Sequence, residues 1–412
     1  MRILVSVILY AGLGLMAARA VTLPPLQGDV AGQLTLRGFG QVPPLDWRIL
    51  AQPGSPGENL FQVDVTAPGL SVGFELQVTD NELISWRIIR GEVDIGRWWR
   101  PLSRRAGMTG IPEDMSMTGL VQMSGAGTIR GTAVNGRVTV DLHHGTVGSM
   151  KQNWTLSGLD VNTQLELGPE GPLVRQQHLR ANEAEALGIK LHNLVLDAIG
   201  ETEGRLTIQN ARIDVLGGQV KLRPFSLDPA KLDIDTVAEL NGVALGALAD
   251  YIPQALSEAS GQINGWVAVG WNAKTGAKTG GGSLTVESAA PASLRLAAMP
   301  GFLTQHTSER IQWLPDAFGP FARWMALENP AYNTLRRIEM GDLPLQVEKL
   351  QVQLYPDGPD GARSAMVEVV ARPATGSAVE KVTFVLNVAG PLDQVLQLGS
   401  DERVKLNFGQ KR

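Results

Sequence analysis

Alternation between apolar and polar side chains is the feature that most constrains how this chain can fold. In residues 70–78, LSVGFELQV, every second residue is apolar and the residues between them are polar or glycine. A period of two places each kind of side chain on its own face of a β-strand. The same alternation recurs at residues 61–65, 138–142 and 382–388. The sequence therefore predicts a sheet with one apolar face, which something must cover.

Glycine is frequent, with 47 among 412 residues, and it often opens a segment of the form Gly-x-apolar-x-apolar. Because glycine weakens a helix by about 1 kcal/mol, this composition favours strands joined by turns. Copies of the segment begin at Gly32, Gly136, Gly204, Gly218 and Gly282. Their irregular spacing indicates successive strands of one antiparallel meander and not a repeat of fixed period.

Residues 205–229, RLTIQNARIDVLGGQVKLRPFSLDP, have the pattern of a β-hairpin. Gly217 and Gly218 can take positive φ without strain, so they are predicted to form its two-residue turn. The pairs predicted to lie opposite each other are Val215 with Val220, Ile213 with Leu222, and Asp214 with Lys221. One face of this hairpin would be apolar and the other charged.

The apolar phase changes at Gly158 and again between Val347 and Leu350. A β-bulge at each place would keep the apolar side chains on one face of the sheet. The sequence therefore predicts irregular strand pairing at both positions.

Helical patterns are few. A short helix is predicted near residues 243–252, where Pro253 would end it, and a helical segment near residues 308–337. Residues 272–282, NAKTGAKTGGG, have the composition of a flexible loop.

Residues 1–20 combine Arg2, an apolar run and a small-x-small ending at Ala20. This pattern is typical of a secretory signal peptide cleaved after Ala20, with an uncleaved inner-membrane anchor as the alternative. We therefore expect an exported chain, and the absence of cysteine means that no disulfide stabilises it.

Common chemistries find little support in the sequence. The net charge is −5 and the basic residues are scattered, so no nucleic-acid partner is expected. Among the 5 histidines, His143 and His144 would point to opposite faces of a strand, and no metal site is predicted. Asp233 and Asp235 share a strand face, where carboxylates are usually solvated. No known catalytic motif occurs, so we predict neither catalytic residues nor a cofactor.

Two aromatic stretches allow a membrane interpretation beside a packing one. Trp98 and Trp99, between two arginines, could anchor the chain at a membrane interface. The favoured interpretation is that one indole is buried in the protein and the other is half-exposed. The second stretch is an apolar stripe made of Phe318, Phe321, Trp324, Met325 and Leu327. It could touch a membrane, but the favoured interpretation is a helix that covers a sheet.

Residues 211–271 resemble the repeating β-groove unit of AsmA-like proteins, in which a Gly-Gly hairpin precedes F-x-L, an apolar helix and G-x-I-x-G. The matching positions are Gly217, Gly218, Phe225, Leu227, Leu245, Leu248, Gly261, Ile263 and Gly265. The C-terminal part is similar to the YdbH-type branch and its L-x-N-F-x-Y-x-x-L motif. Leu327, Asn329, Tyr332 and Leu335 match that motif, whereas Pro330 replaces the aromatic residue.

This resemblance implies a bacterial envelope protein, at or near the inner membrane, whose sheet curls into a groove that shields phospholipid acyl chains between membranes. The physical argument agrees, because so few helical residues cannot cover so many strands. Acyl chains would be held by apolar burial, at about 0.8 kcal/mol per CH₂ group. The expected partners are phospholipid acyl chains, the inner or outer membrane surface, and envelope proteins.

The sequence thus predicts a mainly β protein with a long curled antiparallel sheet that forms an elongated groove. The expected regions are a signal peptide or anchor over 1–20, a repeating β-groove over 21–271, a flexible loop over 272–282, and a YdbH-type C-terminal region over 283–412. The residues predicted to line the groove are Val72, Phe74, Leu76, Val138, Val140, Ile213, Val215, Val220, Leu222, Ile263, Val267, Val269, Phe384 and Leu386.

The predicted function is phospholipid transfer between inner and outer membrane in the periplasm of a Gram-negative-type bacterium, without enzymatic activity. Two alternatives stay open. One is an envelope assembly or structural factor whose apolar face is closed by its own side chains. The other is an exported enzyme or glycan-binding β-protein, which would show converging polar groups.

Overall fold

The computed structural model describes residues 27–35, 43–53, 58–79, 83–105, 114–131, 133–151, 153–169, 171–186, 189–201, 204–228, 233–249, 256–272, 276–286, 291–313, 325–356, 363–374 and 377–389. Within them the protein is mainly β, and 21 strands belong to one sheet. The chain forms two compact units, which are unit 1 (residues 1–213 and 224–233) and unit 2 (residues 214–223 and 234–412). The predicted fold class of one long antiparallel sheet with few short helices is confirmed.

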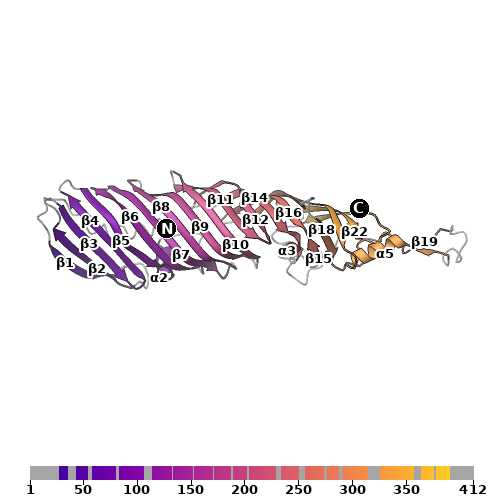
Figure 1. The fold of residues 1–412 in the computed structure, drawn as a ribbon, viewed down its shortest axis with the longest axis horizontal. Coiled ribbons are helices and arrows are strands. Elements are labelled where there is room, and N and C mark those ends of the chain that lie inside the picture. The colour runs from indigo at the N-terminus through magenta and orange to yellow at the C-terminus, as the bar shows by residue number, and fades with distance from the viewer. Residues whose placement is uncertain are drawn as a thin grey trace. The chain divides into compact units, whose positions relative to one another are not determined.

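Unit 1 is a meander in which strands pair with their neighbours in sequence (Figure 1). Its strands are β1 (Gly28–Leu34), β2 (Leu45–Pro53), β3 (Glu58–Ala67), β4 (Leu70–Thr79), β5 (Leu83–Asp94), β6 (Ser116–Arg130), β7 (Ala133–Ser149), β8 (Trp154–Gly168), β9 (Gly171–Ala186), β10 (Ile189–Gly200), most of β11 (Leu206–Val215), and β13 (Phe225–Leu227). Its described helix is α2 (Ile95–Arg105).

Unit 2 combines sheet strands with two short helices and a separate two-stranded ribbon. Its strands are β12 (Gly218–Leu222), β14 (Ile234–Ala244), β15 (Leu256–Ser260), β16 (Gln262–Asn272), β17 (Gly276–Val286), β18 (Ala292–Leu296), β21 (Leu345–Leu354), β22 (Arg363–Pro373) and β23 (Val382–Ala389). The helices are α3 (Leu245–Ala249) and α5 (Pro330–Glu339), and the ribbon consists of β19 (Arg310–Ile311) and β20 (Leu327–Glu328).

The core of unit 1 lies on one face of the meander. Residues paired across successive strands share a face, and one such row is Phe74, Ile88, Gly125, Val138 and Leu165. The Phe74, Val138 and Leu165 side chains of this row are nearly inaccessible to solvent. The alternation that predicts an apolar face therefore produces a packed layer of side chains in this unit.

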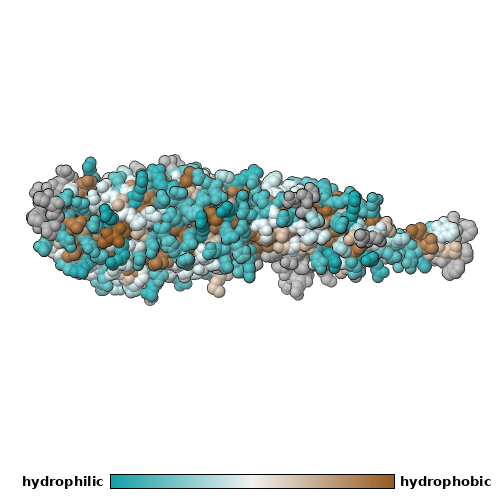
Figure 2. All heavy atoms as spheres, in the orientation of Figure 1, coloured by the Kyte–Doolittle hydropathy of each residue, from teal (hydrophilic) through white to brown (hydrophobic). Residues whose placement is uncertain are grey.

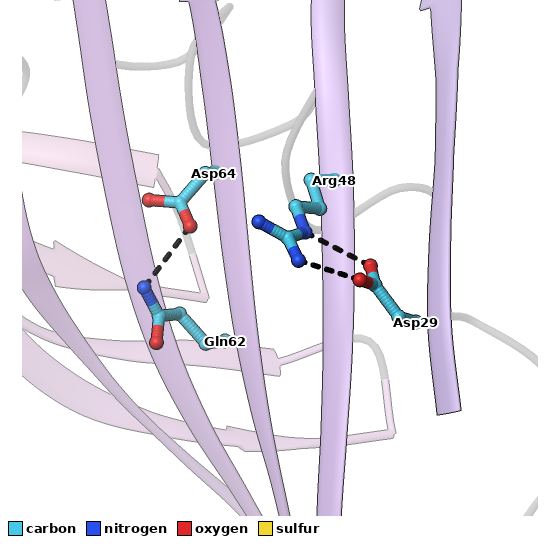
Figure 3. Close-up of polar contacts among 4 residues, drawn as sticks. All are labelled: Asp29, Arg48, Gln62 and Asp64. Atoms are coloured by element: carbon cyan, nitrogen blue, oxygen red, sulfur yellow. Dashed lines mark hydrogen bonds and ion pairs between the residues drawn. The ribbon is translucent and has the colours of Figure 1, made fainter. Parts of the chain in front are cut away.

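The opposite face of unit 1 is polar. Figure 2 shows one side of the molecule, on which hydrophilic residues predominate over these strands. In the close-up of Figure 3, Arg48 on β2 donates to both carboxylate oxygens of Asp29 on β1, at 2.9 and 2.5 Å, and Gln62 donates to Asp64 at 3.0 Å. The Arg48–Asp29 pair joins two strands and helps to fix which strand lies beside which, whereas Gln62 and Asp64 both lie on β3.

Both predicted bulges are present. The β7–β8 and β8–β9 registers skip Gly158, which has a φ of +60°. The β21–β22 register skips Glu348, which lies between Val347 and Lys349. Each irregularity restores the apolar phase that the sequence changes at that point.

The turn of the predicted hairpin lies one residue earlier than expected. Leu216 and Gly217 occupy it with φ of 49° and 76°, and β12 begins at Gly218. A Cβ atom on Gly218 would lie 2.4 Å from the Val243 backbone nitrogen, so this glycine serves the close approach of β12 to β14. The predicted opposite pairs are therefore wrong. The pairs concerned are the predicted ones, Val215 with Val220, Ile213 with Leu222, and Asp214 with Lys221. Asp214 instead accepts a hydrogen bond from Gln219 at 3.0 Å.

The helices differ in extent from those predicted. Helix α3 lies inside the predicted interval 243–252, and α5 occupies only the end of the interval 308–337. The earlier part of that interval contains β19 and β20. Helix α2 lies outside the predicted helices. Asp94, directly before it, accepts from the Gly96 N–H at 3.0 Å, so the sequence contains a capping signal that the prediction missed.

Part of the expected loop at residues 272–282 is a strand. Strand β17 begins at Gly276 and pairs with β16 along its length, while its second half also pairs with β21. Hydrogen bonding from both sides holds a glycine-rich segment that composition alone assigns to a loop.

Candidate functional site

One face of unit 2 brings together predicted lipid-facing residues from separate strands. Val220 on β12 lies opposite Leu240 on β14, and Leu222 lies opposite Ala238. Ala238 in turn lies opposite Val267 on β16. Since cross-strand partners share a face, the apolar side chains of β12, β14 and β16 form one surface. We call this surface the unit 2 apolar face.

The same face continues across the later strands of unit 2. Val267 lies opposite Gly282 on β17, and Gly282 lies opposite Leu354 on β21. Val269 and Phe384 lie on this face as well, by their pairing on β16 and β23. Leu386 pairs with Val367 on β22, and its side chain lies outside the described part of the structure.

Burial divides the unit 2 apolar face into two zones. In the first, Ile263 is 3% exposed and belongs to a buried cluster with Leu245 of α3, Leu294 of β18 and Ile338 of α5. In the second, the apolar side chains are only partly buried, and its members include Val220, Leu222, Leu240, Val267, Val269, Leu284, Val352 and Leu354. The second zone is therefore apolar surface that the described side chains do not fully cover.

The predicted groove residues of unit 1 lie elsewhere, in a closed core. Val72, Phe74, Leu76, Val138 and Val140 are each 2% exposed or less. They pack among the side chains of neighbouring strands in one continuous cluster. Partly buried apolar side chains, among them Ile84, Ile88 and Ile129, pack against the margin of this cluster. Two further predicted residues, Ile213 and Val215 on β11, are half-buried.

Trp86 lies at the centre of the unit 1 core and was not predicted as a key residue. It is 1% exposed and pairs with Gly127 on β6, which pairs with Gly136 on β7. A Cβ atom on Gly127 or Gly136 would come within 2.7 or 2.6 Å of the Trp86 ring. The two glycines thus make room for one indole, a relation that sequence alternation alone does not reveal.

The tryptophans of α2 pack against the protein and bond to its backbone. Trp98 is 6% exposed and donates through Nε1 to the Pro68 carbonyl at 3.3 Å. Trp99 is half-buried and donates to the Met115 carbonyl at 3.3 Å. The favoured interpretation of one buried and one half-exposed indole is confirmed.

Glu339, at the end of α5, is a buried carboxylate that no sequence pattern singles out. Its side chain is 3% exposed and accepts from the Leu303 and Thr304 backbone N–H groups and from the Thr304 hydroxyl, at 2.9, 3.1 and 2.8 Å. Burial on its own would raise the pKa of Glu339, but these donors outweigh it and hold the pKa below its usual value. Glu339 therefore fastens the turn around residues 301–304 to the helix.

The YdbH-type motif residue Asn329 is structural. Its Oδ1 accepts from the Ala331 N–H at 3.1 Å and caps α5, with Pro330 at the first helical position. Its Nδ2 donates to the Ser308 carbonyl at 2.8 Å, and its N–H donates to the Glu309 carbonyl at 2.9 Å. Asn329 thus joins the base of the β19–β20 ribbon to the helix.

Titratable side chains of the described residues form small cross-strand clusters, such as Glu348 with Arg372 and Lys381. No group of three or more potential metal ligands occurs in this described part of the chain. Asp233 and Asp235 are exposed, and the His143 ring nitrogen lies 3.8 Å from Asp160. On the polar side of unit 1, Asn210 and His178 both bond Asp197, and their bonds hold the pKa of that carboxyl below its usual value despite partial burial. These contacts tie strands together.

No helix in the described ranges has the length and apolar character needed to cross a membrane. Comparison with curated proteins gives no match, and comparison with solved structures gives none either.

The fold and the site together define a class: an antiparallel sheet protein with apolar faces and, among its described residues, no group of three or more potential metal ligands. The family can be stated as well. The model of the YdbH-like family, described as intermembrane phospholipid transport protein YdbH, matches residues 99–305, half of the chain. The chain belongs to this family, whose described role is transport and not catalysis. The match runs from α2 to the turn that Glu339 holds.

Proposed function

We propose that this protein carries phospholipids between the inner and outer membranes of a bacterial envelope, with acyl chains lying on the half-buried zone of the unit 2 apolar face. One observation carries the proposal. In a chain of the YdbH-like family, that zone crosses β12, β14, β16, β17 and β21 without a charged side chain on the same face.

Acyl chains would bind there by apolar burial. Each methylene group removed from water contributes about 0.8 kcal/mol, and the absence of fixed polar contacts lets a chain slide along the strands. Gly265 and Gly282 serve a different purpose, the close approach of β16 and β17, since a Cβ atom on either would lie within 2.7 Å of a backbone oxygen.

The core of unit 1 favours a different role for that part of the molecule. Its apolar face is filled by its own side chains, as expected for a structural element. We therefore propose that β3–β8 support the carrier and that the lipid path of the described residues lies on unit 2. The predicted candidates Val72, Phe74, Leu76, Val138 and Val140 then act as core residues.

Native mass spectrometry of the purified protein tests the proposal. Wild-type protein should retain phospholipid, and Val267→Glu should reduce lipid occupancy several-fold, because a carboxylate on this face must be desolvated when a chain binds. Val30→Glu is the matched control, since Val30 is 58% exposed on β1. Its occupancy should equal that of the wild type.

Two results would overturn the proposal. One is unchanged lipid occupancy in Val267→Glu. The other is wild-type protein that carries no phospholipid and transfers none between liposomes.

A further inference from the structure

The β19–β20 ribbon has one apolar face that is exposed. Ile311 lies opposite Leu327, and Arg310 lies opposite Glu328. Because side chains alternate along a strand, Ile311 and Leu327 share one face, while Arg310 and Glu328 share the other. Trp313 follows Ile311 by two residues and donates through Nε1 to the Met325 carbonyl at 3.0 Å.

The apolar side chains of this face are open to solvent. Ile311 is 47% exposed, Trp313 is 56% exposed and Leu327 is 65% exposed. Figure 2 shows hydrophobic residues on the ribbon, beyond α5 of unit 2. We had expected the stretch containing Leu327 to cover a sheet as a helix, and for Leu327 that expectation is wrong. Three large exposed apolar groups on one small ribbon need another partner.

The ribbon is held at its base and so presents this face in a fixed way. Asn329 bonds the Ser308 and Glu309 carbonyls on one side and caps α5 on the other. Exposure of Leu327 therefore follows from the fixed geometry of the ribbon.

Charge and composition indicate what that partner is. Arg310 and Glu328 face each other and cancel, and residues 311–327 contain one acidic and one basic residue, Asp316 and Arg323. A face with an indole, two aliphatic groups and no net charge is complementary to the interfacial region of a bilayer whose lipids have no net charge, where Trp is favoured. A ribbon with two residues in each strand is also far too small for a stable interface between two copies of the chain, which needs about 800 Å² on each partner.

We propose that the apolar face of the β19–β20 ribbon, formed by Ile311, Trp313 and Leu327, inserts into the surface of a phospholipid bilayer. This proposal rests on the proposed function, because a carrier that moves lipid between membranes must contact a membrane. It concerns a surface separate from the unit 2 apolar face. Binding should depend little on salt and should not require anionic lipid.

Site-specific fluorescence tests the insertion. The chain has no cysteine, so Leu327→Cys in the full protein offers one labelling site for an environment-sensitive dye. Addition of phosphatidylcholine vesicles should shift its emission to the blue and shield it from an aqueous quencher. The matched control is Arg310→Cys, on the opposite face of the same ribbon, which should stay accessible to the quencher.

Vesicle flotation provides an independent readout without a dye. The variant Ile311→Ser/Trp313→Ser/Leu327→Ser should bind these vesicles at least about tenfold more weakly, because each group loses its apolar transfer energy. Met150→Ser, at a residue that is 94% exposed in unit 1, should bind as the wild type. Circular dichroism and lipid occupancy should be unchanged in both variants.

The outcomes separate this proposal from the proposed function. Equal flotation of the triple variant and the wild type, or equal quenching at the two labelled sites, overturns bilayer insertion even if lipid occupancy is normal. Absence of vesicle binding in the wild type, with cross-linking of Leu327→Cys to an envelope protein, overturns it in favour of a protein partner. Loss of lipid occupancy alone bears on the unit 2 apolar face and not on the ribbon.

Discussion

Trp86 fills the space that two glycines leave in the core of unit 1. Replacement by alanine would empty this space, and loss of a buried Trp costs about 3–5 kcal/mol. We expect Trp86→Ala to lower the free energy of unfolding of unit 1 by that amount in urea. Trp86→Phe should cost clearly less, because the phenyl ring still fills part of the space above the two glycines. The indole N–H that it removes has no acceptor among the described residues.

Ile89→Ala is the matched control, since Ile89 lies on the same strand as Trp86 and is 46% exposed. Its effect should stay below about 1 kcal/mol. Equal losses for Trp86→Ala and Ile89→Ala would show that the Trp86 side chain is not a centre of packing in unit 1.

Glu339 makes the stability of unit 2 depend on pH. Its folded pKa lies below the usual 4.5 because of the donors from Leu303 and Thr304, so the unfolded state binds more protons in acid. The stabilisation is complete above pH 4.5 and is lost as the pH falls through the folded pKa. In Glu339→Gln, the urea midpoint of unit 2 should depend less on pH within this window. An unchanged profile would contradict the assignment.

Strand register depends on the glycine at the β8 bulge. Gly158 has a φ of +60°, and a Cβ there would lie 2.6 Å from the Asn182 side-chain nitrogen. Left-handed backbone costs an alanine about 1–2 kcal/mol, so Gly158→Ala should destabilise unit 1 by at least that much. Gly168→Ala, where a Cβ meets no atom within 4 Å, should be nearly neutral in the same urea titration. A neutral Gly158→Ala would refute this role of the bulge.

Elements with strict alternation could be predicted from the sequence, and elements with competing signals could not. Strand β4 and the bulges at Gly158 and Glu348 follow from apolar phase. The hairpin turn was misplaced because two glycines compete for it, and contact with β14 decides which one takes positive φ. Leu327 was predicted on a helix because its spacing from Phe318, Phe321 and Trp324 fits a helical stripe. Those three residues lie outside the described part of the structure, and Leu327 lies on β20.

The candidate site could be predicted only in part from the sequence, for a related reason. Alternation shows which residues share a face, and Val220, Leu222, Val267 and Val269 do so. It does not show how deeply a face is covered, so Val140 and Val267 look alike in the sequence. Coverage depends on contacts with distant strands and with helices such as α3 and α5.

At the scale of the whole molecule, the apolar face is more deeply buried in unit 1 than in unit 2. This difference predicts which strands contact bound lipid. Phospholipids with a photoreactive group in the acyl chain can be loaded on the unmodified protein and cross-linked. Peptides from β12, β14, β16 and β17 should carry most of the adducts, and peptides from the centre of β4–β8 few. Adducts concentrated around Phe74 and Val140 would instead mean that the unit 1 core opens to lipid.

Pairing between sequence neighbours also governs how the chain reaches its native state. From β2 to β10 each strand pairs with the one before it, so every new pairing closes only a short loop. Low contact order allows hairpin after hairpin to add to a growing edge. A chain that emerges gradually from a translocation channel can therefore fold from its first strands onward, before its last strands have appeared.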